Sequence, residues 1–140
     1  EITEKYAADG IKAYISVNKA LVTQSSAAIP IVPLYISILY KVMKEKGVHE
    51  GCIEQMYRLF AEKFGADGKP VSGAVDGEGR IRLDDLEMKP EIQDEVTKLW
   101  NILNADNFKE YTDIEGYWKD FYELFGFGID GVDYEADVEV

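Results

Sequence analysis

The sequence contains a single cysteine and a single histidine among its 140 residues. One cysteine cannot form an internal disulfide bond, so the chain fits a reducing compartment, which we take to be the cytoplasm. His49 and Cys52 lie three residues apart beside Glu50 and Glu54, but no second pair with metal-ligand spacing follows. We therefore expect no metal site. Cys52 is expected to be a small buried residue, and His49 and Glu50 to cap the next helix.

Long apolar runs, nucleotide-binding glycine motifs and positive charge are also scarce. The longest apolar run, from Ile29 to Tyr40, is too short to span a bilayer and contains two prolines and a serine. No G-x-G-x-x-G, P-loop or G-x-S-x-G motif is present. The net charge is −12, and residues 107–140 carry the largest share of the acidic excess. Such a surface repels phosphate backbones and anionic lipids, which argues against nucleic-acid and membrane partners.

The hydrophobic content is sufficient for the core of one domain. It amounts to 46% of the residues, and 12% are aromatic. The first residues, Glu1 to Ala8, have a helical pattern that ends at Asp9-Gly10. A chain that begins without methionine inside a helix is expected to be a piece of something longer.

Hydrophobic periodicity predicts a mostly helical α/β chain with two or three short strands. Residues 12–22 alternate and then become continuously apolar, which is typical of a buried strand. Pro33 suits a helix N-terminus, and residues 34–46 are predicted to form a helix buried on all sides. The later predicted elements are an amphipathic helix at 49–64, a glycine-rich loop at 65–79, a short strand or arm at 80–88, helices at 90–103 and within 112–128, and a strand or tail at 132–138.

Residues 74–85, AVDGEGRIRLDD, resemble the calcium-binding loop of an EF-hand. Asp76 and Gly79 match its third and sixth positions, but Ala74 stands at the first ligand position and Asp85 replaces the bidentate glutamate. An acidic helical calcium-binding or interaction module is therefore one hypothesis for the chain. The other interpretation of this stretch is a solvated, hairpin-like loop without a bound ion.

Two tyrosine–lysine pairs fall in the predicted 34–46 helix, and the four-residue pair has the spacing by which short-chain dehydrogenases place a proton-donating tyrosine beside a lysine. Tyr40 and Lys44 are four residues apart, which brings two side chains together on one helix. Tyr35 and Lys44 are nine apart, which places them on opposite sides of a straight helix. We favour core packing for both tyrosines and a charge at the helix C-terminus for Lys44.

Two long stretches resemble a known enzyme family. The segments LVTQSSAAIPIVPLYISILYKVMKEKGVHEGCIEQMYRLF and LFGFGIDGVDYEADV are similar to the NADH-dependent trans-2-enoyl-CoA reductases and the related FabV-type enoyl-acyl-carrier-protein reductases. The similarity covers nearly the whole chain and is loosest in 65–90. It implies that residues 1–140 are the C-terminal part of a single Rossmann-type domain of the short-chain dehydrogenase class, without the nucleotide-binding N-terminal half.

The resemblance also implies an activity and a set of contacts. The family reduces the 2,3 double bond of enoyl thioesters of coenzyme A or acyl-carrier protein with NADH, and its catalytic Tyr and Lys lie upstream of this chain. The implied cofactor contacts are Leu21, Val22, Thr23 and Gln24, at the carboxyl end of the predicted 12–22 strand. The implied walls of the acyl pocket are Val32, Ile36, Tyr40 and Tyr117.

A chain without the N-terminal half should be inactive alone. Its parallel strands and its buried 34–46 helix would lose neighbours that the absent half supplies. We expect it to self-associate or to persist only with the missing half bound.

Overall fold

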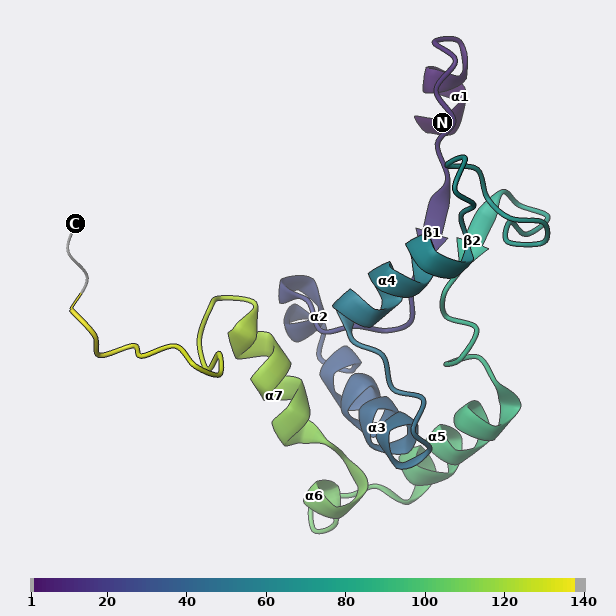
Figure 1. The fold of residues 1–140 in the computed structure, drawn as a ribbon. Coiled ribbons are helices and arrows are strands. Elements are labelled where there is room, and N and C mark those ends of the chain that lie inside the picture. Colours follow the sequence, from purple (N-terminus) through teal and green to yellow (C-terminus); the bar gives the residue numbers. More distant parts are fainter. Residues whose placement is uncertain (1, 138–140) are drawn as a thin grey trace.

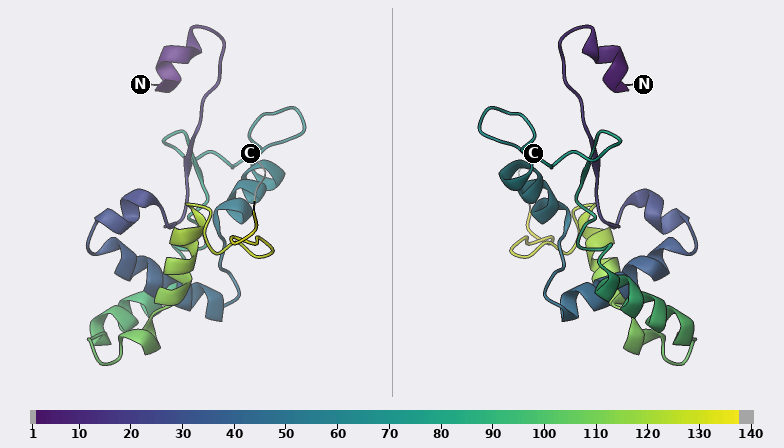
Figure 2. Two further views of the ribbon diagram at one scale, coloured as in Figure 1. Left: turned by 90° about the vertical axis from the view of Figure 1, so that its left-hand side faces the viewer. Right: turned by 90° about the vertical axis from the view of Figure 1, so that its right-hand side faces the viewer.

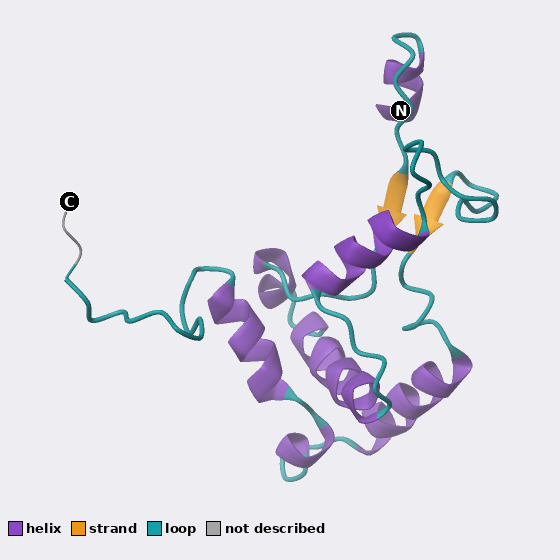
Figure 3. Cartoon of the chain, in the orientation of Figure 1, coloured by secondary structure: helices purple, strands orange, loops and turns teal. Residues whose placement is uncertain are grey.

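The computed structural model describes residues 2–137 of the chain. Helices dominate, and two short parallel strands are the only sheet in this part of the chain (Figures 1 and 3). The elements in order are α1 (Ile2–Ala7), β1 (Ile15–Val17), α2 (Gln24–Ala28), α3 (Val32–Glu45), α4 (Cys52–Glu62), β2 (Arg80–Arg82), α5 (Pro90–Ile102), α6 (Phe108–Tyr111) and α7 (Ile114–Glu123). No helix of residues 2–137 is long and apolar enough to cross a membrane.

Strand β1 is much shorter than the predicted 12–22 strand. It pairs in parallel with β2, so that Ser16 lies beside Ile81. Beyond Val17 the chain stays extended, but side chains bind its peptide groups instead of a neighbouring strand. The Lys19 N–H donates to Gln55 at 2.9 Å, and the Ala20 N–H donates to Glu87 at 2.7 Å. The alternating pattern correctly indicated extended backbone, but it could not show which groups bind it.

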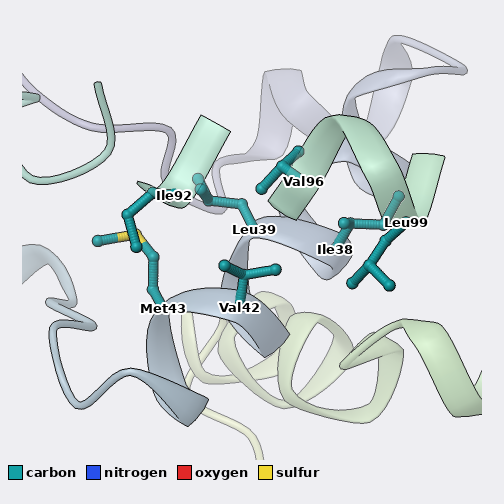
Figure 4. Packing of buried hydrophobic residues seen from close by; sticks show 7 residues of the cluster. All are labelled: Ile38, Leu39, Val42, Met43, Ile92, Val96 and Leu99. Atoms are coloured by element: carbon teal, nitrogen blue, oxygen red, sulfur yellow. The ribbon is translucent and has the colours of Figure 1, made fainter. Parts of the chain in front are cut away.

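Helix α3 is the centre of the structure and is buried as predicted. It packs against α5 on one side and α7 on the other, and Figure 4 shows its contact with α5. The shared core consists of Ile38, Leu39, Val42 and Met43 from α3 with Ile92, Val96 and Leu99 from α5. Fully burying one such side chain stabilises a fold by about 1.5–3 kcal/mol. This contact therefore holds the 34–46 region firmly in place.

The helix boundaries agree with the predictions to within a few residues, with two additions. Helix α2 lies between the predicted 12–22 strand and 34–46 helix, where no element was predicted, and Thr23 caps it: its hydroxyl oxygen accepts a hydrogen bond from the Ser26 N–H at 3.0 Å. The short helix α6 was not predicted at all. The predicted 1–8 helix is confirmed as α1, although Glu1 lies outside the described residues.

Residues 132–138 were predicted to be a strand or a tail, and the tail is the alternative that holds for residues 132–137, which form no strand; residue 138 lies outside the described range. A tyrosine organises this region as a loop: the Tyr134 hydroxyl donates to the Gly126 carbonyl at 2.7 Å and accepts from the Ile129 N–H at 2.8 Å. Strand β1 therefore pairs with β2 and not with the C-terminal segment. Helix α1 stands apart from the helical body at the other end of the chain (Figures 1 and 2).

Helix α4 is amphipathic, as predicted, but it is turned the opposite way. Its buried residues are Gln55, Arg58 and Leu59, two of which are polar. The predicted apolar face is turned outward, with Ile53, Tyr57 and Phe60 all strongly exposed. The polar side is held inside by hydrogen bonds, since the Arg58 guanidinium donates to Glu50, Asp85 and the Leu83 carbonyl.

Candidate functional site

A pocket of about 640 Å³ opens where the extended segment after β1 meets α3, α4 and α7. Its walls are Leu21 and Val22 from the extended segment, Tyr40 from α3, His49 and the start of α4, and the end of α7. The lining residues are Leu21, Val22, Tyr40, His49, Gly51, Cys52, Ile53, Glu54, Asp120, Glu123 and Leu124. Four parts of the chain, from residue 21 to residue 124, therefore meet at one cavity.

The structure brings together five of the eight predicted site residues. Val22, Ile36, Tyr40 and Tyr117 form one buried cluster, and Val32 packs against it. Helix α3 begins at Val32, so Val32, Ile36 and Tyr40 share one helix face, as the spacing required. Of these five residues, Val22 and Tyr40 also line the pocket, whereas Ile36 and Tyr117 are almost completely buried behind it.

Thr23 and Gln24 take a different place from the other predicted residues. Thr23 caps α2 and Gln24 is the first residue of that helix, and neither lines the pocket. The cap uses Thr23 as a hydrogen-bond acceptor, and among residues 2–137 its hydroxyl proton has no acceptor. Leu21 precedes them, and its peptide N–H and carbonyl have no hydrogen-bond partner within the described chain. These groups remain able to bind a ligand.

Tyr40 lines the pocket, and its hydroxyl is bound to a carboxylate. Its hydroxyl donates to Asp120 at 2.8 Å. Burial and the neighbouring Asp120 carboxylate raise the pKa of Tyr40 far above its ordinary value. Lys44, the partner suggested by the four-residue spacing, lies over the Tyr40 ring and pairs with Asp113 at 2.5 Å. The expectation of core packing for Tyr40 is confirmed, since the side chain is 1% exposed.

Tyr35 is also held by a carboxylate. Its hydroxyl donates to Glu87 at 2.5 Å, and burial together with this bond raises the pKa of Tyr35 to about 12. Glu87 and Asp113 thus hold Tyr35 and Lys44 separately, and the nine-residue spacing does not form a working pair.

His49 is the unusual group of the pocket. Its ring packs edge-on against the Tyr40 ring, with 4.5 Å between the ring centres. Burial, reinforced by the charges of Lys19 and Lys44, lowers the pKa of His49 to about 4, so the imidazole is neutral near pH 7. Its Nδ1 atom is buried and has no hydrogen-bond partner among residues 2–137. Buried polar atoms are almost always paired, so the unpaired Nδ1 is an exception in this part of the structure.

The expectations for the turn before α4 were partly wrong. Gly51, not His49 or Glu50, is the N-cap of α4, and the Glu54 carboxylate accepts from the Gly51 N–H at 3.0 Å. Glu50 instead pairs with Arg58. Cys52 is exposed, because it begins the helix at the pocket wall and not in the core.

Lys19 is a buried functional candidate that the sequence did not reveal. It is 2% exposed, and its ammonium group lies 4.7 Å from the centre of the Tyr40 ring. Burial lowers its pKa to about 8, although Glu87 and Asp120 oppose the shift. Sequence reasoning also missed Gln55, Glu87 and Asp120, for a reason that applies to Lys19 as well. Each is a single polar residue in an amphipathic pattern, and its importance comes from a partner far away in the sequence.

The calcium hypothesis finds no support in the structure. Asp76 turns its carboxylate onto its own loop, accepting from the N–H groups of Glu78 and Arg80, both at 2.9 Å. Within residues 2–137 no group of three or more His, Cys, Asp or Glu side chains could hold a metal ion. The stretch is a hairpin-like loop, with an antiparallel bridge between Val75 and Ile81.

Comparison with known proteins assigns the chain to a family. Residues 1–64 match the model of the trans-2-enoyl-CoA reductase catalytic region, and residues 75–138 match the enoyl reductase FAD binding domain. The chain belongs to the enoyl reductase family. It is 57% identical over its whole length to the NADH-dependent trans-2-enoyl-CoA reductase of Ruminiclostridium cellulolyticum. Over 92% of its length it is 58% identical to the NADH-dependent enoyl-acyl-carrier-protein reductase of Coxiella burnetii.

Solved structures of the family have the same fold. The trans-2-enoyl-CoA reductase of Clostridium acetobutulicum in complex with NADH is 50% identical to the chain and covers 99% of it, with a TM-score of 0.85. The Treponema denticola enzyme in complex with NAD is 45% identical over 98% of the chain, also with a TM-score of 0.85. The chain spans only 34% of either structure and 31–34% of the two curated enoyl reductases.

Proposed function

We propose that this chain is the C-terminal part of an NADH-dependent reductase of trans-2-enoyl thioesters, and that it forms the wall between the nicotinamide and the acyl chain. One observation carries the proposal. The predicted cofactor residue Val22 and the predicted acyl residues Ile36, Tyr40 and Tyr117 form a single buried cluster beside the pocket. Residues assigned to two ligands thus meet where the two ligands must react.

The pocket suits the nicotinamide end of the dinucleotide better than its phosphates. Its charged lining groups are the carboxylates of Glu54, Asp120 and Glu123, which repel a pyrophosphate. The unpaired peptide groups of Leu21 are hydrogen-bonding groups of the kind that an uncharged carboxamide needs. One matching family model is that of an FAD binding domain, but both curated relatives are NADH-dependent reductases, and we propose NADH as the cofactor.

NADH, when bound, supplies the hydride that adds to carbon 3 of the enoyl thioester. The chain's own residues position and shield the reactants. The Leu21 peptide groups and the Thr23 hydroxyl would hold the carboxamide, with Gln24 beside them at the start of α2. The apolar face of Val32, Ile36 and Tyr40, closed by Tyr117, would exclude water from the acyl chain. The proton donor is expected in the upstream part of the enzyme, since Tyr35 and Tyr40 are both tied to carboxylates.

The proposal also includes the finer fold and the setting. The parallel pair β1 and β2, joined through α2, α3 and α4, fits the last two strands of a Rossmann-type sheet. A single exposed cysteine is compatible with the reducing cytoplasm. The thioester is carried by coenzyme A or acyl-carrier protein, as in the two curated relatives.

A chimaeric enzyme tests this function directly. Residues 1–140 would replace the matching segment of the Clostridium acetobutulicum enzyme, which covers 99% of this chain. We expect the chimaera to oxidise NADH when a crotonyl thioester is added, followed by the absorbance at 340 nm. A chimaera that folds and binds NADH but does not reduce the thioester would contradict the proposal.

A further inference from the structure

The outward face of α4 is apolar, whereas its inward face combines two polar residues, Gln55 and Arg58, with the apolar Leu59. We define the α4 apolar face as Ile53, Tyr57 and Phe60, which are 76%, 75% and 68% exposed, flanked by Met56 and Ala61. The opposite side of the helix carries Gln55 and Arg58, which are 0% and 9% exposed. Residues three and four apart share a helix face, so the sequence of α4 specifies two sides that both have a partner.

The inward side already has its partners within the chain. Gln55 accepts from the Lys19 N–H, and the Arg58 guanidinium donates to Glu50, Asp85 and the Leu83 carbonyl. These bonds fix the rotation of α4 about its axis, because turning the apolar face inward would leave the Lys19 N–H and the Leu83 carbonyl without their partners inside the fold. These hydrogen bonds therefore keep the α4 apolar face turned outward, where it lines a shallow apolar groove of about 520 Å³.

The apolar surface continues from α4 to the open edge of the sheet. The Phe60 and Phe64 rings stack with 6.1 Å between their centres, and Phe64 meets Tyr14 edge-on at 6.0 Å. Tyr14 precedes β1, whose first residue, Ile15, is 58% exposed. In residues 2–137 β1 pairs only with β2, so its other edge offers unpaired peptide groups. Figure 1 shows α4 lying beside the two strands.

We propose that the α4 apolar face and the free edge of β1 together dock the portion of the enoyl reductase that this chain lacks. The solved relatives have about two thirds of their length outside the region that matches this chain. An apolar helix beside an open parallel strand is what one end of a larger α/β sheet presents, since parallel sheets are covered on both faces. A second copy is disfavoured as the occupant, because each chain carries a net charge of −12.

The inference rests on the proposed function, and the same chimaera tests it by a separate readout. In a Cys52→Ser background, Phe60→Cys and Lys69→Cys introduce one thiol each, on the α4 apolar face and on an exposed loop. The side chain of Lys69 is 69% exposed, so the two positions are about equally accessible in the isolated chain. Alkylation by iodoacetamide is followed at each residue by mass spectrometry.

We expect the thiol at position 60 to react at least about tenfold more slowly than that at position 69 in the chimaera, because a covered group reacts only after local opening. Equal rates in an active chimaera would overturn the docking inference and leave the proposed function standing. Slow alkylation at position 60 in an inactive chimaera would support the docking inference and overturn the proposed function. Tyr57→Cys provides a second reporter if Phe60→Cys prevents folding.

An experiment on the isolated chain tests whether a second copy covers the α4 apolar face. We expect both thiols to react at similar rates at every protein concentration. Protection of position 60 that increases with the concentration of the isolated chain would assign the face to a second copy and contradict the proposal.

Discussion

Removing the Tyr40 hydroxyl is expected to weaken folding and to leave catalysis almost unchanged. In the chimaera, Tyr40→Phe deletes one buried donor whose acceptor, Asp120, lies 2.8 Å away. A hydrogen bond to a charged group contributes about 1.5–3 kcal/mol to stability. Asp120 is partly exposed, so water replaces some of the lost bond and the lower end of this range applies. The ring, its contact with His49 and its place in the cluster remain.

Two measurements separate the structural role of Tyr40 from a catalytic one. Urea unfolding should show a loss of about 1.5 kcal/mol for Tyr40→Phe, and a smaller additional loss when Asp120→Asn is combined with it, because the two changes remove the same bond. The maximal rate of NADH oxidation should stay within a few-fold of the parent chimaera. General acid–base groups contribute about 10²–10⁴-fold to rates. A fall of that size in a folded Tyr40→Phe variant would refute the reasoning and restore Tyr40 and Lys44 as a proton-transfer pair.

Three further outcomes are expected. In the chimaera Thr23→Val should raise the KM for NADH, because it removes a hydroxyl donor worth about 0.5–1.5 kcal/mol. The control, Thr23→Ser, keeps both the donor and the α2 cap. Equal KM values for the two variants would exclude the contact. The pKa of His49 is near 4 in the folded chain against 6.5 when unfolded, so the unfolded state binds the extra proton and stability should fall as the pH drops from 6.5 to 4. In urea titrations His49→Phe should lose this part of the pH dependence. Parallel curves of stability against pH for the two proteins would contradict the assignment. The isolated 140-residue chain should show no NADH-dependent reduction of a crotonyl thioester, and measurable turnover by this chain alone would contradict that expectation.

Local patterns were sufficient to predict much of the fold and part of the site. Pro33 and the spacing of Val32, Ile36 and Tyr40 depend only on neighbours along the chain, so the helix and its shared face could be predicted. The face of α5 with Ile92, Val96 and Leu99 was visible for the same reason. The resemblance to the family added Tyr117, which periodicity alone could not connect to α3.

The remainder depends on partners that are distant in the sequence. Glu87 binds the peptide of Ala20 across 67 residues, and Asp120 binds Tyr40 across 80. Nothing near Glu87 or Asp120 distinguishes them from exposed acidic residues, so their roles were missed. The periodicity of α4 showed that an apolar face exists, but not on which side its partner lies. That orientation is decided by Arg58 and its two carboxylate partners.

The hydrogen bond from the Ala20 N–H to the Glu87 carboxylate affects the order in which parts of the chain fold during synthesis. The peptide groups after β1 cannot take their final positions until residue 87 has left the ribosome, and the cluster around Tyr40 must wait for Tyr117 and Asp120. Contacts across such long loops are entropically costly to close and form late. The part of the pocket wall that Leu21 and Val22 form, although encoded early in the chain, should therefore be among the last parts to become ordered. A chain released before residue 117 should contain the α3–α5 core but no completed pocket.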